Sequence, residues 1–271
     1  MKRKLILGLA VFCLAGPACA DWAINMPKGI TDMSHETWRL HMHVFWWCVA
    51  IGIVVFGTMA YTIFKHRKSR GHQAAQFAHN GKLEVVWTAI PVIILLIMAV
   101  PAAETLVKLE YTQDPDLTVV ITGYQWRWHY EYPDLGVEFF STLAAESNAA
   151  RRKGSGIDPA TVENYLLDVD KPLVVPKGAK VRVLLTSKDV IHAWWVPALA
   201  IKKDAIPGFM NQMWFRPEQT GTYRGQCAEL CGVDHGYMPV VVHVVEPAEF
   251  KTWVAARAEE AAPATAAGEE E

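Results

Sequence analysis

Two long apolar runs without a charged side chain limit the folds open to this chain more than any other feature. The first covers residues 44–64 and the second covers residues 85–103. Each is long enough to cross a hydrocarbon core of roughly 30 Å as a helix, and two such runs in one short chain favour membrane spans over buried core helices. Pro91 and Pro101 agree with this, because neighbouring membrane helices can satisfy the backbone groups that proline frees. We therefore predict a two-helix transmembrane hairpin.

Residues around these runs predict how the hairpin is oriented. The basic side chains between the runs, at positions 65–82, belong in the cytoplasm by the positive-inside rule. Residues 1–20 have the pattern of a signal peptide, with a basic start, an apolar stretch and Ala-Cys-Ala before Asp21. A lipoprotein cut before Cys19 is a weaker alternative, because Gly-Pro-Ala precedes that cysteine. Both signals place the second half of the chain in the periplasm of a bacterium whose inner membrane holds the hairpin.

The composition agrees with a protein that lies partly in lipid. Of the 271 residues, 52% are hydrophobic and 11 are Trp, and the net charge of -2 gives no indication of nucleic-acid binding. The five Cys do not form a disulfide framework, since two fall in the leader and one in an apolar run. Cys227 and Cys231 remain as one close pair.

Beyond residue 104 the pattern changes to short apolar or alternating runs separated by Gly and Pro. Such a series predicts an all-β domain, an antiparallel sandwich or barrel, over residues 105–258. We interpret 117–132 as its clearest strand, with aromatic side chains sharing one face. These aromatic residues are Tyr124, Trp126, Trp128, Tyr130 and Tyr132. Further strands are predicted at 173–175, 180–186, 211–215, 221–223 and 240–245.

The segments outside these strands complete the predicted domain plan. Residues 21–104 hold the hairpin and the polar segment before it. Residues 144–158, which include three consecutive basic side chains, indicate an exposed insertion in the β domain. The final segment, 259–271, is rich in Ala and Glu and predicts a disordered tail.

Metal-binding side chains gather in one short segment near the end of the β domain. Positions 227–238 hold two thiols, an imidazole, a thioether and a carboxylate, and a further imidazole lies upstream. Glycines and a proline interrupt the segment, which disfavours a helix that would make these residues ordinary core positions. The residues are Cys227, Cys231, His235, Met238 and Glu229, with His192 upstream.

Three readings of this segment remain open from the residues alone. Structural zinc would use the two Cys and two His but has no evident use for Met238. A copper chaperone or thiol-redox protein would need neither His235 nor Met238. A copper site uses all of them, because thiolate and thioether sulfur are soft donors and imidazole also suits copper. The donor set therefore favours copper.

Five motifs occur together along the chain. They are Glu84-Val-Val-Trp87, Gly123-Tyr-Gln-Trp-Arg-Trp-His-Tyr-Glu-Tyr132, His192-Ala-Trp-Trp-Val-Pro197, Lys203-Asp-Ala-Ile-Pro-Gly208 and Gly225-Gln-Cys-Ala-Glu-Leu-Cys-Gly232, the last continuing through His235 and Met238. With them the chain resembles subunit II of the haem-copper cytochrome c oxidases, from the first apolar run to about Trp253. The resemblance implies a transmembrane hairpin carrying a cupredoxin-like Greek-key β-barrel with a binuclear copper centre, CuA.

The resemblance also implies a role for each candidate ligand. Cys227 and Cys231 would bridge both coppers, and His192 and His235 would each bind one copper. Met238 would be a weak ligand. Glu229 would ligate through its backbone carbonyl, and its side chain would reach a magnesium site shared with subunit I.

Further implied roles concern electrons, protons and partners. Trp126 matches the family's electron-entry tryptophan, and Glu84 matches the acid at the mouth of a proton path. The electron donor would be a cytochrome c, steered by acids such as Glu131, Asp134 and Asp189. The acceptor would be haem in subunit I, where oxygen is reduced and protons are pumped, and subunit III would complete the complex. Three positions depart from the family pattern and put the docking surface in question: Tyr124, Arg127 and Lys188.

Other functions, on the same fold or from another class, remain as alternatives. A quinol-oxidase subunit would have lost the copper ligands that this chain keeps. A membrane-anchored copper chaperone would bind one copper and cycle its Cys pair through a disulfide. A CuA subunit of another terminal reductase is the third, which the hairpin and Glu84 fit less well. The chain has no Cys-x-x-Cys-His haem-attachment motif.

Overall fold

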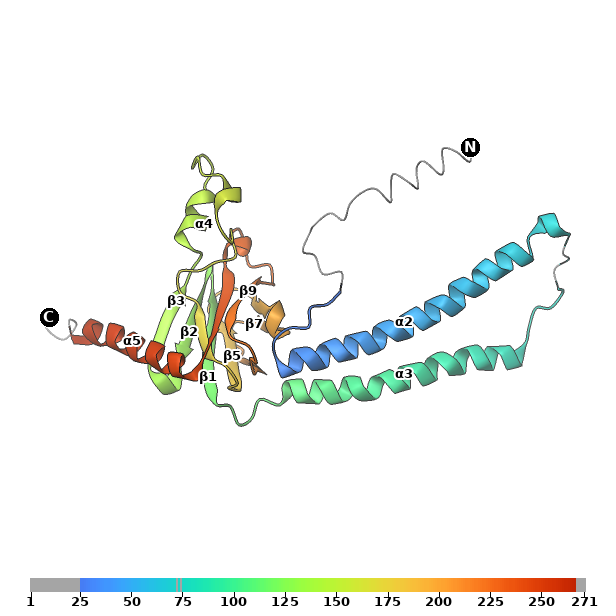
Figure 1. Ribbon diagram of the computed structural model, residues 1–271, viewed down its shortest axis with the longest axis horizontal. Coiled ribbons are helices and arrows are strands. Elements are labelled where there is room, and N and C mark those ends of the chain that lie inside the picture. Colours follow the sequence, from blue (N-terminus) through green and yellow to red (C-terminus); the bar gives the residue numbers. More distant parts are fainter. Residues whose placement is uncertain (1–24, 72, 74, 267–271) are drawn as a thin grey trace.

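The computed structural model describes residues 25–71, 73 and 75–266, so the predicted signal peptide lies outside the described residues. Two long helices, α2 (Asp32–Lys65) and α3 (Gly81–Glu110), run side by side away from a β domain (Figure 1). Within these two helices, both fully described, no residue of the most apolar window is buried. The predicted hairpin is confirmed, and both helices extend beyond the apolar runs.

Hydrogen bonds fasten the hairpin to the β domain at its extracytoplasmic end. Thr31 caps α2 in a capping box with Ser34, and its Oγ1 donates to the backbone carbonyl of Leu199 at 3.1 Å. On the other helix, Trp214 Nε1 donates to the carbonyl of Lys108 at 3.1 Å. Because α3 continues to Glu110, the boundary predicted at residue 104 falls inside a helix.

The strands of the described residues form two five-stranded sheets. One has the order β3-β2-β1-β5-β8 and the other β4-β10-β9-β6-β7. Most neighbours are antiparallel, as predicted, but β1 with β5 and β4 with β10 are parallel. The strands are β1 (Leu117–Tyr124), β2 (Arg127–Tyr132), β3 (Val137–Ser141), β4 (Leu173–Pro176), β5 (Val181–Ser187), β6 (His192–Val196), β7 (Ile201–Ala205), β8 (Asn211–Phe215), β9 (Gly221–Cys227) and β10 (Pro239–Val245). The all-β fold is confirmed.

The stretch predicted as one strand over 117–132 is two strands, so that prediction is wrong. The chain reverses at Gln125 and Trp126, and the antiparallel register pairs Tyr124 with Arg127. Trp128, Tyr130 and Tyr132 still share the buried face of β2, but Tyr124 and Trp126 lie at the turn. Contacts of the turn with distant loops, described below, override the alternating pattern there.

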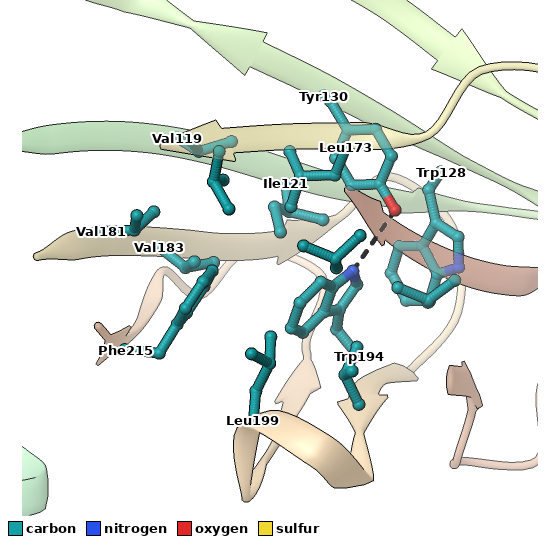
Figure 2. Packing of buried hydrophobic residues seen from close by; sticks show 14 of the residues in the cluster. Val119, Ile121, Trp128, Tyr130, Leu173, Val181, Val183, Trp194, Leu199 and Phe215 are labelled. Atoms are coloured by element: carbon teal, nitrogen blue, oxygen red, sulfur yellow. Dashed lines mark hydrogen bonds between the residues drawn. The ribbon is translucent and has the colours of Figure 1, made fainter. Parts of the chain in front are cut away.

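The core lies between the two sheets. Figure 2 shows residues of β1 and β2 facing residues of β6 and the turn that follows it. Trp194 Nε1 donates to the hydroxyl oxygen of Tyr130 at 3.4 Å, which satisfies one buried donor (Figure 2). Full burial of a Val, Leu, Ile or Phe side chain in this core contributes about 1.5–3 kcal/mol to the free energy of folding. Labelled members of the core are Val119, Ile121, Trp128, Tyr130, Leu173, Val181, Val183, Trp194, Leu199 and Phe215.

Two helices correct the sequence predictions outside the sheets. Helix α4 (Ala145–Ala150) buries Ser147 and Ala150, so the predicted insertion is not exposed throughout, although residues 152–158 are. Helix α5 (Pro247–Ala266) includes most of the segment predicted as a disordered tail. Ala and Glu are good helix formers, which explains why the helix continues through this composition. Residues 267–271 lie outside the described residues.

Candidate metal centre

The candidate metal-binding side chains lie at the ends of neighbouring strands. Strand β9 ends at Cys227 and β10 begins at Pro239, so the loop between them carries most of the candidate ligands. The loop contains the 3-10 helix η5 (His235–Tyr237) and is closed by a backbone bond from Cys227 N–H to Met238 O at 3.3 Å. His192 starts β6, which pairs with β9.

The other four candidate donors surround the two thiols. The Sγ atoms of Cys227 and Cys231 are 3.8 Å apart. Cys227 Sγ lies 3.9 Å from His192 Nδ1 and 3.4 Å from the backbone oxygen of Glu229. Cys231 Sγ lies 3.5 Å from the Nδ1 atom of His235 and 3.6 Å from the Sδ atom of Met238. Each thiol thus has its own imidazole and one further donor.

This donor set fits copper. His192, Met238, Cys231 and Cys227 are all buried, with exposed fractions of 0%, 2%, 3% and 6%. A closed zinc site takes four ligands and leaves a thioether unused, whereas thiolate, imidazole and thioether together suit copper. Two thiols and four further donors also exceed the four ligands that one tetrahedral ion needs. The prediction that these residues bind copper therefore agrees with their arrangement.

The two thiols differ in acidity. Burial raises the pKa of the Cys227 thiol, but hydrogen bonding with His192 and with the backbone at Ala193 and Glu229 outweighs it and holds the pKa at about 7. Burial, together with the neighbouring Cys227 sulfur, raises the pKa of Cys231 to about 12. Without metal, Cys227 is therefore the thiol that ionises near neutral pH.

Contacts outside the donor set orient the His192 imidazole. Its Nε2 atom lies 2.9 Å from Oδ1 of Asp189, and its ring packs against Trp128 with the centroids 5.9 Å apart. Since Nδ1 faces Cys227, Nε2 is the nitrogen that donates a proton to the carboxylate. Asp189 is one of the acids expected to steer a docking partner, and in the structure its carboxylate also contacts the candidate ligand His192.

The β1–β2 turn contacts the loop between β9 and β10, which carries most of the candidate ligands. Gln125 N–H donates to Asp189 Oδ2 at 2.7 Å, and the Gln125 side-chain amide donates to the carbonyl of Cys231 at 2.9 Å. Trp126 Nε1 donates to that carbonyl at 3.1 Å. At Gly232, where φ is +116°, a Cβ atom would lie 3.0 Å from the Trp126 ring, so this position requires glycine. The candidate electron-entry residue thus directly contacts the metal-binding loop.

Other predicted residues lie elsewhere. Glu84 is in the first turn of α3, at the opposite end of the hairpin, where its Oε1 is 2.7 Å from His79 Nδ1. The side chain of Glu229 is partly exposed in the loop. Glu131 is partly exposed on β2, and Asp134 is exposed in the 3-10 helix η2 (Pro133–Leu135). The structure therefore brings together the six donors and Trp126 but not Glu84.

Comparisons with known proteins agree with this arrangement. The chain matches the family model described as cytochrome C oxidase subunit II, periplasmic domain, over residues 117–245, and the model of the transmembrane domain of that subunit over 19–104. It is 37% identical over 262 residues to the probable cytochrome c oxidase subunit 2 of Rickettsia bellii (strain RML369-C), covering 95% of this chain and 93% of that protein. The chain belongs to the cytochrome c oxidase subunit II family.

Further relatives are similar over shorter lengths. The cytochrome c oxidase subunit 2 of Cereibacter sphaeroides is 37% identical over 213 residues, which is 76% of this chain and 70% of that protein. A crystal structure of the periplasmic domain of subunit II of cytochrome oxidase of Bradyrhizobium japonicum is 41% identical and covers 55% of this chain and 98% of that one, with a TM-score of 0.47.

Membership of the subunit II family shows which complex the chain belongs to and where its copper domain lies. It is a component of a haem-copper cytochrome c oxidase, it partners subunit I, and it is a membrane protein with a periplasmic copper domain. The sequence alone missed Gln125 and the inward role of Asp189. For Gln125 the sequence did hold one signal, because this residue lies inside the motif that ends at Tyr132.

Proposed function

We propose that this chain holds the binuclear CuA centre, accepts electrons from a cytochrome c and passes them to haem in subunit I for oxygen reduction coupled to proton pumping. The observation that carries the proposal is the convergence of four further donors on one thiol pair. Cys227 and Cys231 would hold the metals through their thiolates, and His192 and His235 would supply the imidazole donors. Met238 and the Glu229 carbonyl complete the set.

The residues of the chain hold the donors in place during electron transfer. A bound binuclear copper centre supplies a one-electron couple shared over two metals. Closure of the loop between Cys227 and Met238, and the Asp189 contact with His192, keep the donors in one arrangement whether or not an electron is present. Four of the donor side chains are buried, which limits how much solvent must reorganise around them.

Trp126 is the proposed entry point for electrons. Its indole N–H bonds the carbonyl of Cys231, which gives a short path through bonded atoms from the turn to a bridging thiolate. The donor would reach Trp126 at the β1–β2 turn, where the exposed Arg127 and Lys188 differ in charge from the acids expected to steer it. Replacing Trp126 by Phe removes the indole N–H and keeps an aromatic ring. The copper spectrum should survive, and reduction by cytochrome c should slow.

Glu84 and Glu229 are proposed to serve the partner subunit. Helix α3 has 30 residues, so it is about 45 Å long at a rise of 1.5 Å per residue. A helix of this length would let Glu84 reach the cytoplasmic membrane surface, where it would open a proton path into subunit I. The Glu229 side chain would contribute to a magnesium site shared with that subunit. The complex would lie in a bacterial inner membrane and include subunit III.

The experiment that tests the proposal is copper reconstitution of the full chain in detergent. Two coppers per chain, with an electron paramagnetic resonance hyperfine pattern from one electron shared by both nuclei, are expected. Replacing Cys227 by Ser should abolish that pattern, while replacing Cys48, which is exposed on α2, by Ser should leave it unchanged. One copper with a mononuclear signal, or zinc alone, would contradict the proposal and favour a chaperone or a structural site.

A further inference from the structure

One side chain outside the donor set contacts the metal-binding loop at two points. Arg151, the residue that follows α4, donates through Nη1 and Nη2 to the two carboxylate oxygens of Asp234, at 2.9 and 3.1 Å. Its guanidinium carbon also lies 4.3 Å from the centroid of the Tyr237 ring. Asp234 immediately precedes His235, and Tyr237 immediately precedes Met238. Arg151 therefore contacts the residue before each of two proposed ligands.

The loop has little other packing on this side. Leu230 is 79% exposed and Val233 is 85% exposed, and the 3-10 helix η5, which carries His235, contains no buried residue. The donors on the other side, Cys227 and His192, belong to strands and are held by the sheet. The other four donors come from the loop, whose exposed side has few contacts besides those that Arg151 makes with Asp234 and Tyr237.

Hydrogen bonds hold Arg151 and the helix before it, α4, in place. Its Nε donates to Asn148 Oδ1 at 2.8 Å, one turn back along α4. In that helix the hydroxyl oxygen of Ser147 accepts a bond from the backbone N–H of Leu166 at 3.1 Å. At the start of the helix, Ala144 N–H donates to the carbonyl of Asp168 at 3.0 Å. The guanidinium is therefore attached to the β domain rather than to a free loop.

We propose that Arg151 is a positioning residue for the copper centre, fixing the part of the loop that brings His235 and Met238 to Cys231. This rests on the proposed CuA function and extends it to a residue that touches no metal. Only Arg combines the two required contacts, since its planar fork matches a carboxylate with two parallel bonds while its face lies on an aromatic ring. Lys would keep the charge and lose both the paired bonds and the stacking.

The test compares three variants of the full chain in detergent after copper loading. Arg151→Ala removes both contacts, and Arg151→Lys keeps the charge and most of the stem. Arg152→Ala is the matched control, because Arg152 is the next residue and is exposed. The measurements are the rate of copper transfer to a Cu(I) chelator, the copper hyperfine couplings, and thermal unfolding of the metal-free chain.

We expect copper release from Arg151→Ala to be roughly tenfold faster, the effect of losing about 1.4 kcal/mol of partly buried charged contacts. The hyperfine couplings should also change, since His235 and Met238 shift relative to Cys231, and Arg151→Lys should recover little of either property. Arg152→Ala should match the wild type. A purely structural role would lower the unfolding temperature without changing the couplings.

Two outcomes would overturn the proposal. Equal release rates and couplings in the wild type, Arg151→Ala and Arg152→Ala would overturn the positioning role and leave the CuA assignment intact. A wild-type chain without the two-copper spectrum would overturn both. Should Arg151→Ala fail to fold, Arg151→Lys decides alone: wild-type release and couplings contradict the proposal, and altered ones support it.

Discussion

Replacing Asp189 by Asn tests how far a carboxylate outside the donor set controls the copper site. Asp189 Oδ1 lies 2.9 Å from His192 Nε2 and accepts Val190 N–H at 2.7 Å, and Oδ2 accepts Gln125 N–H at 2.7 Å. Asn keeps the size of the side chain but removes the negative charge. It also replaces one carboxylate oxygen by an NH₂ group. An N–H group that donated to that oxygen then faces another donor.

The expected effect on copper binding follows from these contacts. Hydrogen bonds to a charged group contribute about 1.5–3 kcal/mol, and loss of such a partner of a metal-binding His typically costs about 10–100-fold in metal affinity. The midpoint potential should rise, because the lost negative charge favoured the oxidised, more positive centre. For a one-electron couple each tenfold change corresponds to about 59 mV, so a shift of tens of millivolts is expected.

Acid stability gives an independent readout of the same contacts. Burial raises the pKa of Asp189, but hydrogen bonds from His192 and from the backbone of Val190 and Gln125 outweigh it and hold the pKa below its ordinary value. A carboxyl with a lowered folded pKa stabilises the fold above its unfolded pKa of about 3.9, and this contribution is lost as the pH falls through the folded value. Asp189→Asn should therefore lose less stability on acidification than the wild type.

The assay is chelator competition and redox titration of the copper-loaded full chain, with denaturant unfolding of the metal-free chain below pH 5. Asp134→Asn is the control, because that acid is exposed and distant from the donors in sequence. The reasoning is refuted if Asp189→Asn has the affinity, potential and acid profile of Asp134→Asn.

Three further predictions concern the donors themselves. A Cβ atom on Gly123 would lie 2.8 Å from His192 Cδ2, so Gly123→Ala should displace that imidazole and alter the copper spectrum of a folded chain; an unchanged spectrum would contradict the packing. Met238→Leu keeps the buried volume and removes the thioether, so copper should remain bound with a changed potential, whereas complete loss of copper would make Met238 more than a weak ligand. In the metal-free chain, alkylation of Cys227 should rise through about pH 7 and precede that of Cys231, which peptide mass spectrometry can follow; modification of Cys231 first would reverse the assigned acidities.

The membrane hairpin could be predicted from the sequence because each span depends only on the residues of one continuous segment. An uncharged run longer than the hydrocarbon core leaves few alternatives, and helices α2 and α3 contain the two predicted runs. Strands with buried alternating residues were also predicted, and β8 was placed at its full extent, Asn211–Phe215. The turn at Gln125 and Trp126 was missed because the same apolar and polar alternation continues through it, and only contacts with Asp189 and Cys231 decide where the chain reverses.

The same distinction separates the donors of the metal site from the residues that orient them. Five of the six donors lie between Cys227 and Met238, so the spacing of residue types was enough to predict them, whereas Arg151 contacts Asp234 across 83 positions and Trp126 contacts Cys231 across 105. Nothing in a short window distinguishes Arg151 from Arg152, although one is bonded to the loop and the other is exposed. A chain could thus keep every ligand and still change how rigidly His235 and Met238 are held. A local motif therefore supplies most of the candidate metal donors. The rate at which the site releases its metal is proposed to depend on contacts between residues far apart in the sequence, such as that of Arg151 with Asp234.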